Sequence, residues 1–157
     1  MSRLNVFDDA PWDMTAEKMR IRTRFFGMPL GAKELGASLH ELLPGSTGFH
    51  LHAHYGMEEM FFVLSGRPTL RTGGDGEEPL GPGDVVFCPR GIDGLHTFTN
   101  PTDEPARVLA VSTMPMPEVV LYPELGKVAV STRNPFETVA DGGDQGIVAM
   151  FDVPAEK

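Results

Sequence analysis

The stretch HLHAHYGMEEMFFVLSG, residues 50–66, decides how this chain folds. Three imidazoles stand at every second position in it, in His50, His52 and His54. Alternate residues of a β-strand point to the same face, so one strand would project these side chains together. A tight turn at residues 55–57 would start an antiparallel neighbour and bring Glu59 beside them. The stretch therefore predicts two paired strands that place histidines and a carboxylate side by side.

A second stretch, GDVVFCPRGIDGLHTFTN at residues 83–100, supplies a further imidazole. His96 stands there at the start of another apolar, strand-like run. Two histidines from one strand, a carboxylate and a distant histidine make a mixed nitrogen and oxygen set. Such a set suits a divalent ion of the first transition row.

The rest of the chain reads as an antiparallel all-β domain, because short runs rich in Val, Leu, Phe and Thr alternate with Gly, Pro and Asp clusters. Seven strands are expected, at residues 37–43, 48–54, 58–65, 68–72, 84–88, 95–100 and 107–113. A hairpin is expected after them, from strands 118–122 and 127–132 turned at 123–126. Before them, residues 19–26 alternate like a strand, and 13–19 predict one helical turn capped by Asp13. Strands of this length and spacing make a sandwich or a barrel.

The spacing of these residues resembles the two motifs of the cupin superfamily of small β-barrel metalloproteins. The first motif is matched by His52-x-His54-x4-Glu59-x6-Gly66, with Ser46 at the place of its leading glycine. The second is matched by Gly83-x5-Pro89-x-Gly91-x4-His96-x3-Asn100, with a loop two residues longer than usual. One pair of motifs indicates a single cupin barrel.

The resemblance implies an all-β fold, a double-stranded β-helix or jelly-roll barrel with N- and C-terminal strand extensions. The expected boundaries are an N-terminal extension at 1–33, the barrel at 34–114 and a C-terminal extension with the hairpin at 115–157. The resemblance also implies four ligands for one metal ion, namely His52, His54, Glu59 and His96. Iron, manganese, nickel, cobalt or zinc would suit them, and the sequence does not choose among these metals.

Other polar and aromatic residues are interpreted by their place beside the motifs. Four candidates for the substrate pocket are His50, Phe61, Arg90 and Phe98. His50 is expected at the rim. Arg90 could reach an anionic group of a substrate or be a surface residue of a turn. Phe61 and Phe98 could line the pocket or belong to the barrel core. His40 is assigned to the surface, because no partner for it is evident in the sequence. The single cysteine, Cys88, is interpreted as a buried structural thiol.

Two classes of function remain open. The first is a metal-dependent enzyme acting on a small organic molecule, of dioxygenase, isomerase or epimerase, or lyase type. The second is a metal-containing binding or sensor module without turnover. A titratable residue near the metal would favour the enzyme, whereas an apolar pocket would favour dioxygen chemistry or binding alone.

The charge composition of the chain argues against two classes of binding partner. Among 157 residues, 22 are acidic and 13 are basic, which gives a formal net charge of -9. Such a field repels nucleic acids and anionic membranes, so neither is expected as a partner. The start of the chain shows no apolar segment of the signal-peptide kind, and one cysteine allows no intrachain disulfide. The expected location is cytoplasmic.

The apolar pattern of the strand at 58–65 also predicts that the chain forms an oligomer. Met60, Phe62 and Leu64 alternate with the inward residues and are equally apolar, so both faces of the strand need a cover. The outer cover would be the N-terminal segment and the hairpin of the same chain, or these segments of a second copy. We expect a homodimer with two-fold symmetry.

Overall fold

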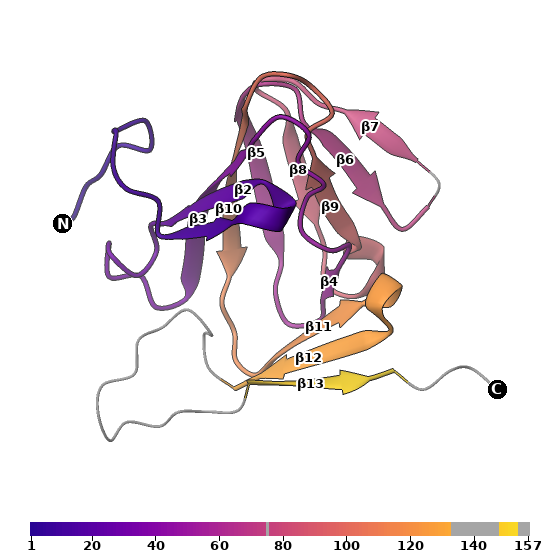
Figure 1. Cartoon of the computed structure of the whole chain (residues 1–157). Helices are drawn as coiled ribbons and strands as arrows, with labels where there is room; N and C mark the ends of the chain where they lie inside the picture. The colour runs from indigo at the N-terminus through magenta and orange to yellow at the C-terminus, as the bar shows by residue number, and fades with distance from the viewer. Residues whose placement is uncertain (75, 133–147, 154–157) are drawn as a thin grey trace.

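Short antiparallel strands build the chain, as the alternation of apolar runs and turn residues predicts (Figure 1). The computed structural model describes residues 1–74, 76–132 and 148–153. Part of the C-terminal extension expected at 115–157 therefore lies outside the described residues. Within the described ranges the structure contains no helix that could span a membrane.

The largest sheet has six strands. In spatial order they are β1 (Met14–Ala16), β2 (Ile21–Phe25), β3 (Leu35–Leu42), β10 (Ala106–Thr113), β5 (Glu59–Ser65) and β8 (Val85–Cys88). The expected strands are thus confirmed for this sheet, and β1 and β2 extend it on the N-terminal side of β3. All of these pairings are antiparallel.

Two smaller sheets complete the fold of the described residues. The first has the order β7 (Glu77–Pro79), β6 (Thr69–Thr72) and β9 (His96–Thr99). The second has the order β13 (Val148–Asp152), β12 (Lys127–Ser131), β11 (Glu118–Tyr122) and β4 (Ala53–His54). The hairpin β11–β12 forms as predicted and turns through a 3₁₀ helix, η3 (Pro123–Leu125). Figure 1 shows this last sheet beneath the barrel, where it closes one end.

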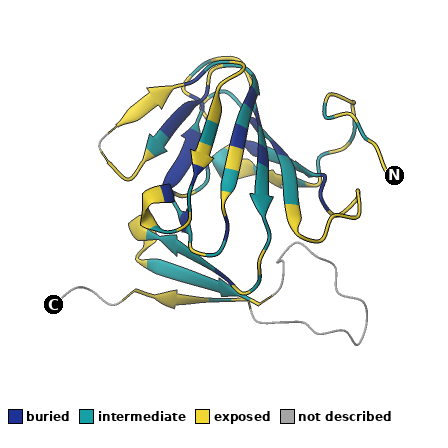
Figure 2. Cartoon of the chain, turned by 180° about the vertical axis from the view of Figure 1, so that it is seen from behind, coloured by how far each residue is buried: buried dark blue, intermediate teal, exposed yellow. Residues whose placement is uncertain are grey.

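The core fills the space between the six-stranded and three-stranded sheets. Phe61 on β5, Val108 on β10 and Leu42 on β3 face Leu70 and Phe98 from the opposite sheet, and all five belong to one buried cluster. Figure 2 shows the buried residues concentrated in these strands, while β13 is largely exposed. Cys88 lies in the same cluster as a free thiol, as predicted.

Three local expectations differ from the structure. The strand expected at 48–54 shrinks to β4, because Gly48 has a positive φ of 77° and turns the chain before it. The helical turn expected at 13–19 is strand β1 followed by the 3₁₀ helix η1 (Glu17–Met19). Asp13 caps no helix, and its carboxylate instead accepts a hydrogen bond from the backbone N–H of Phe25.

Candidate metal centre

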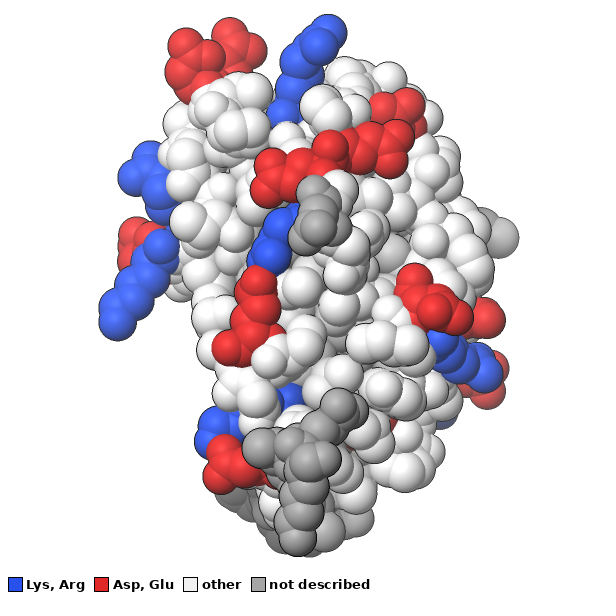
Figure 3. All heavy atoms as spheres, turned by 90° about the vertical axis from the view of Figure 1, so that its right-hand side faces the viewer, with Lys and Arg blue, Asp and Glu red and all other residues white. Residues whose placement is uncertain are grey.

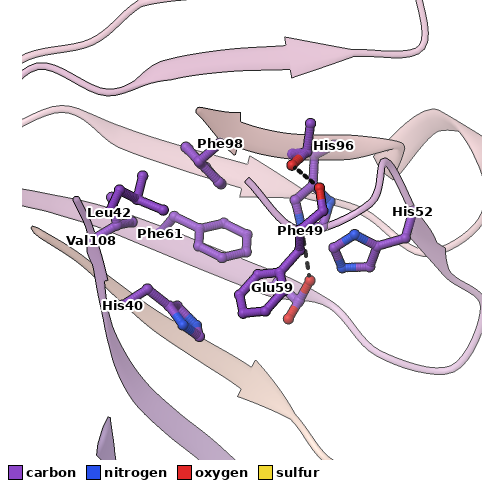
Figure 4. A pocket seen from close by; sticks show the side chains of 10 residues that line it. His40, Leu42, Phe49, His52, Glu59, Phe61, His96, Phe98 and Val108 are labelled. Atoms are coloured by element: carbon purple, nitrogen blue, oxygen red, sulfur yellow. Dashed lines mark hydrogen bonds and ion pairs between the residues drawn. The ribbon is translucent and has the colours of Figure 1, made fainter. Parts of the chain in front are cut away.

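Four residues of the two motifs meet at the end of the barrel nearest the β4 sheet. His52 and His54 come from the short segment that ends in β4, while Glu59 and His96 begin β5 and β9. Backbone hydrogen bonds of 3.2 Å and 2.9 Å join His52 and His96 as an isolated antiparallel bridge. A 3₁₀ helix, η2 (Ile92–Gly94), uses the longer loop of the second motif and leads directly into His96. Figure 4 shows His52, Glu59 and His96 pointing toward one another.

The side chains are close enough to share one ion. Each of His52, His54 and Glu59 offers a ligand atom, and these atoms lie within 4.8 Å of one another. The Oε2 atom of Glu59 lies 3.4 Å from Nε2 of His54 and 3.3 Å from Nε2 of His96. Glu59 is therefore the carboxylate on which the imidazoles converge, and His96 reaches the group through it.

The other nitrogen of each imidazole faces an oxygen acceptor. Nδ1 of His52 lies 2.8 Å from the His50 carbonyl, and Nδ1 of His96 lies 2.8 Å from the Gly94 carbonyl. Nδ1 of His54 lies 3.2 Å from Oε1 of Glu118. These acceptors favour the tautomer in which Nδ1 carries the proton, which leaves the Nε2 lone pair free for a metal.

Glu59 carries a buried oxygen that accepts no hydrogen bond from the described residues. Its Oε2 is one of three buried side-chain atoms without a hydrogen-bond partner among the described residues. A buried acceptor left in this state costs roughly 1–3 kcal/mol. A cation at this point would satisfy it, so the donor set fits a divalent ion.

The surroundings keep two of the imidazoles neutral. Burial, followed by the neighbouring His96 and His54, lowers the pKa of His52 to about 3. Burial also lowers the pKa of His96, although the charge of Glu59 opposes this shift. For His54, burial is outweighed by the hydrogen bond to Glu118 and by the charges of Glu59 and Glu118, so its pKa is raised. In the absence of an ion, His54 is thus the imidazole that most readily holds a proton.

A cavity of about 70 Å³ opens beside these ligands inside the barrel (Figure 4). Its apolar wall consists of Leu42, Phe49, Phe61, Phe98 and Val108. Its polar lining consists of His40, His52, Glu59, His96 and Thr97. Figure 4 places the ligands at one end of the cavity and Leu42 and Val108 at the other.

Residues 38–112 match the family model described as a cupin domain. The chain carries a cupin domain. The matched segment contains both motifs and all four residues of the candidate metal centre. A search of curated proteins finds no match.

Three solved structures are similar over most of the chain. A sugar phosphate isomerase from a cupin superfamily, from Silicibacter pomeroyi, is 26% identical with a TM-score of 0.73, covering 92% of this chain and 84% of that one. A protein proposed to be a sugar phosphate isomerase, from Acidithiobacillus ferrooxidans, is 27% identical with a TM-score of 0.68, covering 84% and 76%. The polyketide cyclase RemF from Streptomyces resistomycificus is 26% identical with a TM-score of 0.63, covering 75% and 83%.

The cupin barrel brings together some of the pocket candidates and leaves others outside. Phe61 and Phe98 line the cavity, with their rings 4.8 Å apart. His50 and Arg90 are exposed and are not among the residues that line it. His50 contributes its backbone carbonyl to the site rather than its side chain.

The assignment of His40 to the surface is wrong. His40 lies on β3 and lines the cavity, with Nδ1 3.0 Å from Oγ1 of Thr23 and Nε2 3.0 Å from Oγ of Ser38. Strand alternation could have found it, because His40 stands two residues before Leu42, which is buried in the core.

Two further residues support the centre from the hairpin. Glu118 is buried and receives hydrogen bonds from His54 and from the backbone N–H of Gly56. The ring of Tyr122 stacks on His52 with centroids 5.9 Å apart. Neither lies in a motif, and the pairing of β11 with β4 that brings them to the site has no local signal in the sequence.

Proposed function

We propose that this cupin binds one divalent first-row transition metal through His52, His54, Glu59 and His96 and acts on a small organic molecule. The observation that carries the proposal is the arrangement of hydrogen bonds around the three imidazoles. Each Nδ1 faces an acceptor, while the buried Oε2 of Glu59 lies without a hydrogen bond near two Nε2 atoms. When bound, such an ion polarises an oxygen of a ligand.

Different residues of the chain would hold the ion, orient its ligands and exclude water. His52, His54, Glu59 and His96 would hold the ion, and Glu118 would hold His54 in its tautomer. The apolar wall would exclude water from the bound molecule. The barrel therefore offers a dry pocket with a polar group of ligands at one end.

A binding module without turnover is the second candidate. The wall beyond the ligands is mostly apolar, and both ring nitrogens of His40 already face hydroxyl groups. Among the described residues, the lining of the cavity supplies no free acid or base beyond the metal centre, which suits dioxygen chemistry or binding alone. Oxygen consumption by the metal-loaded protein in the presence of a bound ligand distinguishes an oxygenase from a binding module.

Metal content of single variants tests the centre. We expect His52→Ala, His54→Ala and His96→Ala each to lose most of the metal that the unmodified protein retains, measured by elemental analysis after gel filtration. His50→Ala and Glu58→Ala are matched controls that should keep it, since both side chains are exposed and the His50 carbonyl survives the change. Retention of metal by His54→Ala together with its loss from His50→Ala would mean that the ligands are assigned in the wrong register.

A further inference from the structure

The cavity beside the candidate metal centre has a chemically divided lining. At one end lie the proposed ligands, and at the other lie the side chains of Leu42 and Val108 (Figure 4). Phe61 and Phe98 stand between these ends, at 5% and 9% exposure. A molecule entering the cavity therefore meets mainly carbon on the sides away from the ligands, where His40 and Thr97 are the polar lining residues.

The polar atoms of the wall are already engaged. Both ring nitrogens of His40 lie 3.0 Å from a hydroxyl oxygen, of Thr23 on one side and Ser38 on the other. The hydroxyl of Thr97 donates to the carbonyl of Phe49 at 2.6 Å. Burial lowers the pKa of His40 to about 4, so this residue carries no charge at neutral pH. A polar or charged substituent pressed against this wall would lose its hydration without gaining a partner.

We infer that the molecule bound here is a small compound that presents oxygen atoms to the ligand end and a short, uncharged, apolar carbon chain to the wall. This inference rests on the proposed function and names the substrate class for the same site. The cavity volume of about 70 Å³ suits a chain of a few carbon atoms. The same wall disfavours a phosphate group, because a phosphate needs charged or hydrogen-bonding partners.

A homologous series of α-hydroxyketones tests the inference. 1-Hydroxy-2-propanone, 1-hydroxy-2-butanone and 1-hydroxy-2-pentanone share one oxygen pair and differ by single methylene groups. Dihydroxyacetone and dihydroxyacetone phosphate keep that pair and carry a hydroxyl or a phosphate in place of the chain. Affinities are measured on cobalt-loaded protein from its visible absorption and by ligand-observed NMR.

We expect affinity to rise about fourfold for each added methylene until the chain fills the cavity. We expect dihydroxyacetone and its phosphate to bind at least tenfold more weakly than 1-hydroxy-2-pentanone. Equal or tighter binding of the phosphate, or affinity that does not change with chain length, would overturn the inference.

Two variants on β10 test whether the apolar wall causes the dependence of affinity on chain length. Val108→Thr places a hydroxyl in the wall at nearly constant volume and should reduce the gain per methylene. Val111→Thr is the matched control, because Val111 lies on the opposite face of β10 and should leave the gain unchanged. Circular dichroism checks that both variants fold, and the series on the unmodified protein decides the question if Val108→Thr does not.

The measurement of bound cobalt separates this inference from the proposed function. If the protein retains no metal, the proposed function fails. The same ketones are then titrated into the metal-free protein by NMR, where the dependence on chain length still supports or overturns the apolar wall.

Discussion

Glu118 fixes the orientation of one proposed metal ligand. Its carboxylate accepts the hydrogen bond from Nδ1 of His54, and it is buried to 3% exposure. Removing such a partner of a metal-binding histidine typically costs 10- to 100-fold in affinity. We expect Glu118→Ala to weaken zinc binding by this factor and Glu118→Gln, which keeps an acceptor oxygen, to fall between, as measured by competition with a chelating dye.

Glu124→Ala provides the control for this prediction. Glu124 lies on the same hairpin, in η3, but its side chain is exposed and pairs with Arg71. Its replacement should leave zinc affinity unchanged. Equal affinities of Glu118→Ala and Glu124→Ala would show that Glu118 does not orient His54.

His40 makes the stability of the barrel depend on pH. Burial lowers its pKa from 6.5 to about 4. The unfolded chain therefore binds more protons than the folded one between these values, and stability falls as the pH drops from about 6.5 to 4. The loss from this residue approaches roughly 3 kcal/mol once the pH is below 4.

The non-titrating variant His40→Gln isolates this contribution. Urea unfolding of the metal-free protein, at pH 7 and at pH 4.5, gives the change in free energy of unfolding for each protein. We expect the unmodified protein to lose roughly 2 kcal/mol more than the variant over this interval. Identical losses would show that His40 titrates normally in the folded state.

At the scale of elements, two glycines with similar backbone angles differ in their surroundings. Gly45 and Gly48 have φ values of 70° and 77°. A Cβ atom on Gly45 would meet nothing within 4 Å, whereas one on Gly48 would collide with the carbonyl oxygen of Phe98 and lie 2.7 Å from Oγ1 of Thr97. Gly48 thus lets the segment before β4 pass close to β9 and bring His52 beside His96.

Alanine substitutions separate strain from collision. Gly45→Ala carries the cost of a left-handed conformation, about 1–2 kcal/mol. Gly48→Ala adds the displacement of β9, typically a further 1–3 kcal/mol. We therefore expect thermal unfolding of Gly48→Ala at a clearly lower temperature than that of Gly45→Ala, and equal transition temperatures would contradict the close approach.

The elements also show what the sequence could and could not predict. In strands such as β5 and β10 the side chains alternate in burial and turn residues mark the ends, so the sequence predicts their bounds. Apolar and polar residues alternate at 48–52 as well, yet this segment is not a strand. Gly48 turns the chain there, and side chains rather than a neighbouring strand bind some of its backbone carbonyl groups. Thr97 binds the carbonyl of Phe49 in this way, from a strand 48 residues along the chain.

The residues of the metal centre also differ in whether the sequence predicts them. The spacing of the motif residues carried enough information to place four side chains together. The contribution of Glu118 depends on the register between β11 and β4, which pairs Val120 with His54. Such long-range pairing is set by how the sheets pack, and no local pattern records it.

At the scale of the whole molecule, the described residues leave one sheet face uncovered. Met60, Val85 and Phe87 on the outer face of β5 and β8 are 40%, 55% and 56% exposed. The hairpin that could have covered them pairs with β4 instead. Elsewhere, as Figure 3 shows for one side, acidic and basic side chains are interspersed.

We still expect a homodimer, formed through this outer face. Burying the three side chains would contribute roughly 1.5–3 kcal/mol each. Light scattering at micromolar concentration should give twice the mass of one chain, and Phe87→Glu should reduce it to a single chain. Phe151→Glu, at an equally exposed position on β13, should leave the dimer intact. A single-chain mass for the unmodified protein would rule the dimer out.

The attachment of the hairpin has a consequence for the centre it supports. Two residue pairs join β11 to β4, Val120 with His54 and Leu121 with Ala53, and Glu118 crosses the same seam. Docking of the hairpin and occupancy of the centre are thus linked equilibria. Whatever free energy an ion gains from an oriented His54 also holds the hairpin in place. By reciprocity, a molecule that binds the docked hairpin more tightly than the undocked one would raise the affinity for the ion by the same factor by which the ion raises the affinity for that molecule.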